Sequence, residues 1–243
     1  MFIRVLDCVT TDHNPVLVLL AVAVAFVSGF TLFSIVDHIR AREGRARELW
    51  TLVAAFVAGA GIWSTHFIAM LGFHPAAAVS YNAGLTAISA LLAIGFAAIA
   101  IPLLVSGERL AACGGSLVLG AAIGVMHFTG MRALTFAGQI EWDGLLVAIS
   151  LGAGSALVVA STLLERRRPL LRYRLAAGAV FGSAICSLHF IAMSAALLRT
   201  SPALSVATGS LSEFYLGLCV ALTTTLIVIF SLVTVMFDQR AHN

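Results

Sequence analysis

Seven apolar stretches, each about 20 residues or longer, constrain this 243-residue chain more than any other feature of its sequence. A helix of that length crosses a hydrocarbon core of about 30 Å, because it rises about 1.5 Å per residue. No stretch shows the two-residue alternation that is typical of strands in a membrane barrel. We therefore predict an all-α membrane protein with seven transmembrane helices, at residues 15–37, 49–71, 83–105, 111–132, 143–164, 172–198 and 213–237.

Little of the chain remains outside these helices. We expect residues 1–14 to form an outer segment, residues 15–237 one membrane domain, and residues 238–243 a cytoplasmic tail. The first helix has no basic leader and no small-residue cleavage site, so it is not a signal peptide. Because the loops are short and no catalytic motif stands out, we expect a stand-alone protein that is not an enzyme and has no output domain.

The arginines predict how the chain is oriented. The composition is 60% hydrophobic and 10% charged with a mean hydropathy of +1.04, and every one of the fourteen basic residues is arginine. Eleven of them fall on one side of the predicted membrane, namely Arg40, Arg42, Arg45, Arg47, Arg109, Arg166, Arg167, Arg168, Arg172, Arg174 and Arg240. The positive-inside tendency then places the N-terminus outside and the C-terminus in the cytoplasm. The net charge of +3 therefore reflects topology and lipid contact, and no nucleic-acid partner is needed to explain it.

An internal repeat is the most informative pattern. Residues 59–70, 120–131 and 182–193 align without gaps as G-x-x-I-x-x-x-H-F-(I/T)-(A/G)-M. The histidines are 61 and 62 residues apart, so each repeat is one pair of helices behind a single leading helix. The three copies therefore run in the same direction, and their histidines reach the same depth near the outer boundary of the membrane.

The residue types in this repeat favour a metal site. Histidine and methionine at i and i+4 project from one helical face, and imidazole with thioether suits copper, with zinc possible through the imidazoles alone. The glycine seven residues before each histidine lies on that face too, and we expect it to let the three motif helices approach one another. Three copies at one depth favour a shared site over three separate packing roles. The predicted ligands are His66, His127, His189, Met70, Met131 and Met193, with Met126, Cys186 and His74 as secondary candidates.

The motifs also resemble those of a known family. The segments Thr65-His66-Phe67-Ile68, Met126-His127-Phe128-Thr129 and Leu188-His189-Phe190-Ile191 are similar to the signature motifs of the MHYT domain, a bacterial seven-helix membrane sensor domain. The resemblance implies a place in the bacterial inner membrane, copper near the periplasmic face and sensing of a diatomic gas such as O2, CO or NO. In this chain phenylalanine replaces the family's tyrosine in every copy, and only Met126 keeps the leading methionine.

The resemblance also bears on the output. Many relatives carry cyclic di-GMP synthesis or hydrolysis domains, or a kinase, after the seventh helix. We expect this chain to signal through a separate signalling protein or a second copy of itself, with the arginine-rich loops 40–47 and 166–174 as contacts.

Two other functions remain open at this stage. A haem held by two of the histidines would also bind gases, and a zinc-binding or metal-transporting membrane protein would use similar ligands. Transport is disfavoured because the repeats look parallel and the acidic residues lie in loops or at helix ends. A retinal protein is excluded because the chain has no lysine.

Overall fold

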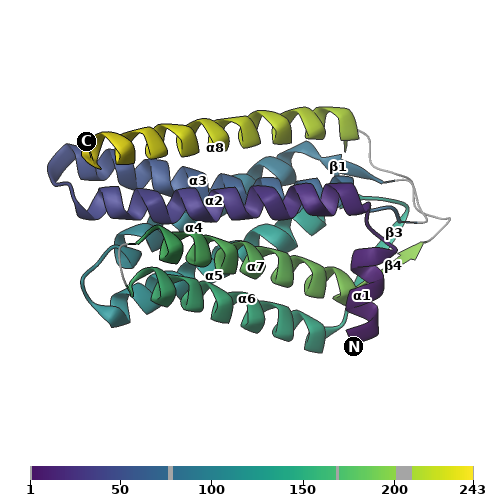
Figure 1. Ribbon diagram of the computed structural model, residues 1–243. Coiled ribbons are helices and arrows are strands. Elements are labelled where there is room, and N and C mark those ends of the chain that lie inside the picture. Colours follow the sequence, from purple (N-terminus) through teal and green to yellow (C-terminus); the bar gives the residue numbers. More distant parts are fainter. Residues whose placement is uncertain (1, 76–78, 168–169, 201–209, 243) are drawn as a thin grey trace.

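Seven long helices lie side by side and form a bundle, with short strands at one end (Figure 1). The computed structural model describes residues 2–75, 79–167, 170–200 and 210–242. Each of the seven long helices is long and apolar enough to cross a membrane. The helices are α1 Phe2–Thr10, α2 Pro15–Arg40, α3 Gly44–Leu71, α4 Ala83–Leu104, α5 Arg109–Ala133, α6 Gly144–Glu165, α7 Leu171–Ala195 and α8 Glu213–His242. The predicted fold class is confirmed, and the short helix α1 lies within the segment that we expected before the first span.

The strands gather at the end of the bundle that carries α1, which we call the sheet end. They are β1 Ser80–Asn82, β2 Leu134–Thr135, β3 Gly138–Trp142, β4 Ala196–Thr200 and β5 Ser210–Leu211. One antiparallel sheet has the order β2-β1-β5, and a second pairs β3 with β4. The connections α2–α3, α4–α5 and α6–α7 lie at the opposite end, which we call the arginine end (Figure 1).

Four helix boundaries differ from the prediction by three residues or more. Helix α2 ends at Arg40 instead of residue 37, α3 begins at Gly44 instead of residue 49, and the other two differences lie at the ends of α7 and α8. The helix predicted over residues 172–198 is wrong at its C-terminal end, because α7 ends at Ala195 and β4 begins at Ala196. Ala196 pairs with Trp142 of β3, so the backbone groups beyond α7 are satisfied by a partner strand instead of another helical turn. The last helix, predicted to end at residue 237, continues to His242, within the expected tail.

Polar caps fix where the helices start at the sheet end. Asn14, Asn82 and Asp143 precede α2, α4 and α6, and each side chain accepts hydrogen bonds from backbone N–H groups of the first turn. The first N–H groups of a helix have no partner inside the helix, so such caps stabilise each start by about 1 kcal/mol. Three of the four spans that begin at the sheet end, α2, α4 and α6, thus begin at a defined depth.

Burial separates the motif helices from the others. In the most apolar window of α3, 83% of the residues are buried, against 17% in α8 and 28% in α6. Helices α5 and α7 are intermediate at 56% each. The helices that carry the repeated motif therefore form the centre of the bundle, and α4, α6 and α8 present large apolar side chains outward to lipid.

The motif glycines bring together different helices from those we predicted. Gly59 faces α4, Gly120 faces α6 and Gly182 faces α2. A Cβ added to these glycines would lie 2.5, 3.0 and 3.2 Å from a backbone atom of the facing helix. The expectation that they let the motif helices approach one another is wrong. They let each motif helix pack closely against a neighbouring non-motif helix, which fixes its rotation.

Candidate metal centre

The three motif histidines meet at one point inside the bundle. His66 on α3 lies with its Nδ1 3.0 Å from Nδ1 of His189 on α7 and 3.2 Å from Nδ1 of His127 on α5. All three side chains are buried, with exposed fractions of 1%, 1% and 3% for His66, His127 and His189. One ligand nitrogen from each lies within 4.8 Å of the others. The predicted convergence of the histidines is thus present, while their role as metal ligands stays a prediction.

The three rings have nearly three-fold related surroundings. Their centroids are 4.9, 5.1 and 5.2 Å apart, and the ring planes cross at 74° to 87°. Each imidazole also meets, edge to face, the phenylalanine that follows it in the motif, at 4.7 to 5.1 Å. Such aromatic contacts limit ring rotation. The repeated phenylalanines therefore orient the candidate ligands, a role that the sequence alone did not indicate.

The separation of the nitrogens fits a single small ion. Two imidazole nitrogens bound to one tetrahedral metal at about 2.0–2.1 Å are about 3.3–3.4 Å apart. The measured 3.0 and 3.2 Å are close to that separation. Nitrogen lone pairs that face one another at this distance repel, and a cation between the Nδ1 atoms removes that cost, while each Nε2 then carries the ring proton. The donor set and geometry of these residues therefore fit a metal ion.

Gly130 on α5 makes room for one of these rings. A Cβ added at this position would lie 2.6 Å from Nε2 and 3.0 Å from Cδ2 of His66. The equivalent positions in the other two copies hold alanine, Ala69 and Ala192. The second copy needs glycine because the imidazole of α3 packs directly against the backbone of α5.

The motif methionines are all buried, with exposed fractions of 1%, 0% and 4% for Met70, Met131 and Met193. Each lies one turn beyond its histidine, toward the sheet end. Met193 lines a cavity beneath α1, whereas Met131 lines a different cavity beside β2 and β3. Ligation by these sulfurs stays a prediction.

Two secondary candidates lie outside the triad. Among the described residues, neither Cys186 nor His74 belongs to the group of ligand atoms formed by the three motif histidines. The exposed His74 instead places its Nδ1 2.8 Å from the carbonyl oxygen of Gly72 and lines the cavity beneath α1. Met126 is buried on α5.

A fourth histidine, which the sequence did not single out, lies beside the triad. His13 is 3% exposed, and its ring meets that of His189 edge to face at 5.9 Å. The segment before α2 is held there by a bridge between His13 and Phe73 and by a 2.8 Å hydrogen bond from the N–H of Asn14 to the Gly72 carbonyl. Burial lowers the pKa of His13, so the ring is neutral. His13 lies outside the three repeats. The only signal in the sequence that could have drawn attention to it is its position just before Asn14-Pro15, where α2 begins.

Comparison with known families agrees with this arrangement. The family model MHYT, described as a bacterial signalling protein N terminal repeat, matches residues 59–115 and 120–178, ranges that contain His66 and His127. The chain belongs to the MHYT family. The third copy, at residues 182–193, lies outside the matched ranges but supplies the third histidine of the same cluster. The chain is thus an MHYT signalling sensor domain, and its seven spans make it a multi-pass membrane protein.

Curated relatives are signalling proteins. The bifunctional diguanylate cyclase/cyclic di-GMP phosphodiesterase MucR of Pseudomonas aeruginosa is 32% identical over 95% of this chain and 35% of the relative. An uncharacterized signaling protein of Caulobacter vibrioides is 31% identical over 98% of this chain and 29% of the relative. The cyclic di-GMP phosphodiesterase NbdA of Pseudomonas aeruginosa is 34% identical over 79% of this chain and 25% of the relative. The chain spans about a third or less of the length of these relatives. No solved structure matches it.

Proposed function

We propose that this MHYT chain is a metal-dependent sensor of the bacterial inner membrane, in which His66, His127 and His189 hold copper and a diatomic gas or a redox change is the signal. The observation that carries the proposal is the convergence of three buried imidazoles whose nitrogens are 3.0 and 3.2 Å apart. Polar side chains inside an apolar bundle cost free energy, and such clusters usually mark a functional site. A metal ion held by these three residues would satisfy the nitrogens and would supply a binding point for a small gas.

Copper is favoured over zinc by the ligand chemistry of the repeat. Three imidazoles alone suit either metal, but the repeat also supplies a thioether one turn after each histidine. Thioether sulfur is a soft ligand that Cu(I) accepts readily and that adds little for zinc. A bound copper ion also supplies a one-electron redox couple, whereas zinc has none.

Haem and transport are less well supported. The two axial nitrogens on opposite faces of a haem iron are about 4 Å apart, with the macrocycle between them. The Nδ1 atoms here are 3.0 and 3.2 Å apart and leave no slot for a porphyrin. For transport, a buried carboxylate within the bundle would be expected. Among the described residues the buried carboxylate, that of Glu165, lies at the arginine end and pairs with Arg40.

The signal would leave through the arginine end. With the N-terminus outside, the triad lies toward the periplasm and the arginine end faces the cytoplasm. There, ion pairs connect α2 with α6 and α7: Arg40 pairs with Glu165, and Asp37 lies 3.7 Å from both Arg40 and Arg174. A shift of α7 at His189 changes the position of Arg174 on the same helix. The receiver is a separate signalling protein, in a cyclic di-GMP pathway like MucR and NbdA, or a second copy of this chain.

Elemental analysis and absorption spectroscopy test the metal role. The parent is purified from the membrane without added metal, alongside a variant with all three motif histidines changed to alanine and a His74→Gln control. We expect copper in the parent and the control, none in the triple variant, and no haem band in any sample. Equal copper in the triple variant and the parent would contradict the proposal. A change in the copper spectrum on exposure to CO or NO tests the gas response.

A further inference from the structure

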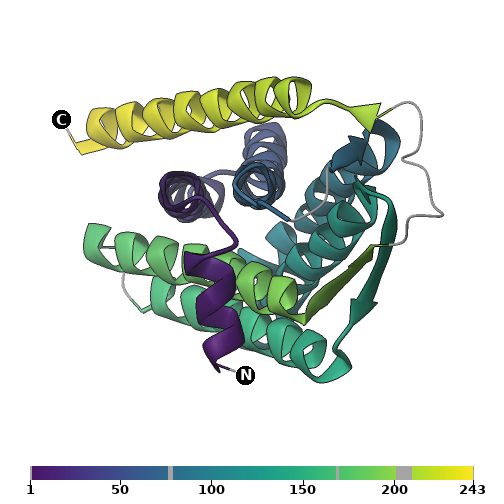
Figure 2. The ribbon, with the colours of Figure 1, turned by 90° about the vertical axis from the view of Figure 1, so that its right-hand side faces the viewer.

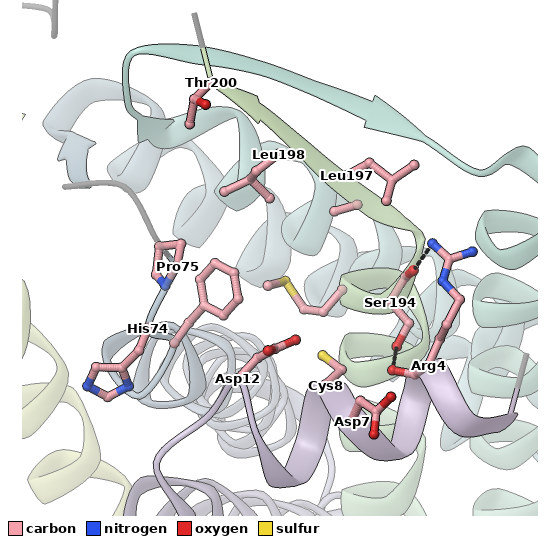
Figure 3. A pocket seen from close by; sticks show the side chains of 13 residues that line it. Arg4, Asp7, Cys8, Asp12, His74, Pro75, Ser194, Leu197, Leu198 and Thr200 are labelled. Carbon is pink, nitrogen blue, oxygen red and sulfur yellow. Dashed lines mark hydrogen bonds between the residues drawn. The ribbon is translucent and has the colours of Figure 1, made fainter.

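The candidate centre is fully enclosed, so an ion needs a route to reach it. The three histidines are at most 3% exposed, and their helices form the centre of the bundle. A cavity of ≈ 580 Å³ opens at the sheet end, between α1, the end of α7 and β4. In Figure 3 the sulfur of Cys8 and the carboxylate of Asp12 lie along this cavity, and Met193 is among the residues that line it.

The lining of this cavity suits a soft cation. Asp7 and Asp12 are exposed at its rim, where negative charge attracts cations from solvent. Deeper in, Cys8 and Met193 are both 4% exposed and supply two sulfur atoms. Burial raises the pKa of the Cys8 thiol to about 11, so it is neutral at physiological pH. Soft sulfur beneath a carboxylate rim favours Cu(I) over hard ions.

His13 lies between this cavity and the triad. Its Nδ1 donates a hydrogen bond to the Cys8 carbonyl oxygen at 2.7 Å, which leaves the lone pair on Nε2. That Nε2 atom is buried and has no hydrogen-bond partner. The ring contacts Phe73 of the cavity wall at 5.2 Å and His189 of the triad at 5.9 Å. A backbone carbonyl that fixes the tautomer of an imidazole in this way is the usual support of a metal-binding histidine.

We propose that the cavity beneath α1 is the route by which Cu(I) enters and that His13 is the transfer ligand that passes the ion from the cavity to His189. The proposal rests on the proposed metal role of the triad. The ion would first bind the sulfur atoms of Met193 and Cys8, with the Cys8 thiol proton released to solvent. It would then exchange the Cys8 sulfur, which takes up a proton again, for Nε2 of His13, and would last exchange His13 for the triad. Each exchange replaces one lone-pair donor by another, and the ion stays Cu(I) throughout.

The test measures how fast metal-free protein takes Cu(I) from its coloured bicinchoninate complex. In His13→Asn the amide still donates to the Cys8 carbonyl, but Nε2 is removed. We expect this variant to load about tenfold more slowly, equivalent to about 1.4 kcal/mol in the barrier, and to reach the parent's final copper content. Glu141→Gln, which changes an exposed side chain of β3 outside the cavity, should load at the parent rate. Cys8→Ala, which keeps the backbone carbonyl, should also load more slowly.

Each alternative result overturns a distinct statement. If His13→Asn loads at the parent rate, His13 is not a transfer ligand although the parent binds copper. If it loses copper as completely as a triad variant, His13 belongs to the resting centre. If Glu141→Gln slows loading equally, the effect of His13→Asn is not specific to His13. If His13→Asn does not fold, an unchanged rate in Cys8→Ala overturns the route. A parent that takes up no copper overturns the proposed function as well.

Discussion

Gly130→Ala displaces one candidate ligand without changing any ligand's chemistry. The added Cβ would lie 2.6 Å from Nε2 of His66, whereas ordinary contacts begin at 3.4 Å. The ring must therefore move by about 3.4 − 2.6 = 0.8 Å, away from α5 and out of its present position against His127 and His189. Overpacking of this kind costs about 1–3 kcal/mol. If that cost falls on the metal-bound state, copper affinity drops about fivefold to 150-fold.

The matched control for this variant is Gly114→Ala, on the same helix. A Cβ at Gly114 meets no atom within 4 Å, and alanine is the better helix former by about 1 kcal/mol. Competition titration against a Cu(I) chelator should show weaker binding for Gly130→Ala and parent affinity for Gly114→Ala. Thermal unfolding of both metal-free variants separates loss of affinity from loss of fold. Parent affinity in a folded Gly130→Ala protein would refute the argument that His66 is a ligand held against α5.

Three further predictions address the ligands, the orientation and the arginine end. Met70→Leu should leave copper content near that of the parent but shift the reduction potential or gas response, because imidazole binds Cu(II) more strongly than thioether. Complete loss of copper, measured by elemental analysis, would show that the thioether is needed for binding and would contradict this ranking of the ligands. Reporter fusions and cysteine labelling should place loop 40–48 in the cytoplasm, and labelling from the periplasm would invert the bundle. Glu165→Gln should lower stability by about 1–3 kcal/mol in thermal unfolding, because it removes the charged acceptor of two Arg40 hydrogen bonds and leaves Arg40 only its longer contact with Asp37. Glu141→Gln, in an exposed ion pair, should cost about 0–1 kcal/mol, and equal costs would show that burial of the first pair is unimportant.

The sequence predicted those features that repeat along the chain. The spacing of His66, His127 and His189 implied equal depth on parallel motif helices, and the structure brings their nitrogens within 4.8 Å. Hydropathy found all seven spans because burial in lipid requires long apolar runs. Both signals are sums over many residues, so no single contact decides them.

Features that occur once were not predictable in the same way. His13 reaches the triad only because the segment before α2 pairs with Phe73, a contact between residues 60 positions apart in sequence. The end of α7 depends on pairing of Ala196 with Trp142. The motif glycines were assigned to the wrong neighbours, because helical periodicity gives a direction and not the helix that lies there.

X-ray absorption at the copper edge of the purified protein tests the central claim most directly. The account predicts copper with a shell of about three imidazole nitrogens near 2.0 Å, with the multiple-scattering pattern of histidine rings, that disappears in the variant lacking all three motif histidines. A spectrum without imidazole scattering, or one that is the same in parent and triple variant, would contradict a metal centre built from His66, His127 and His189.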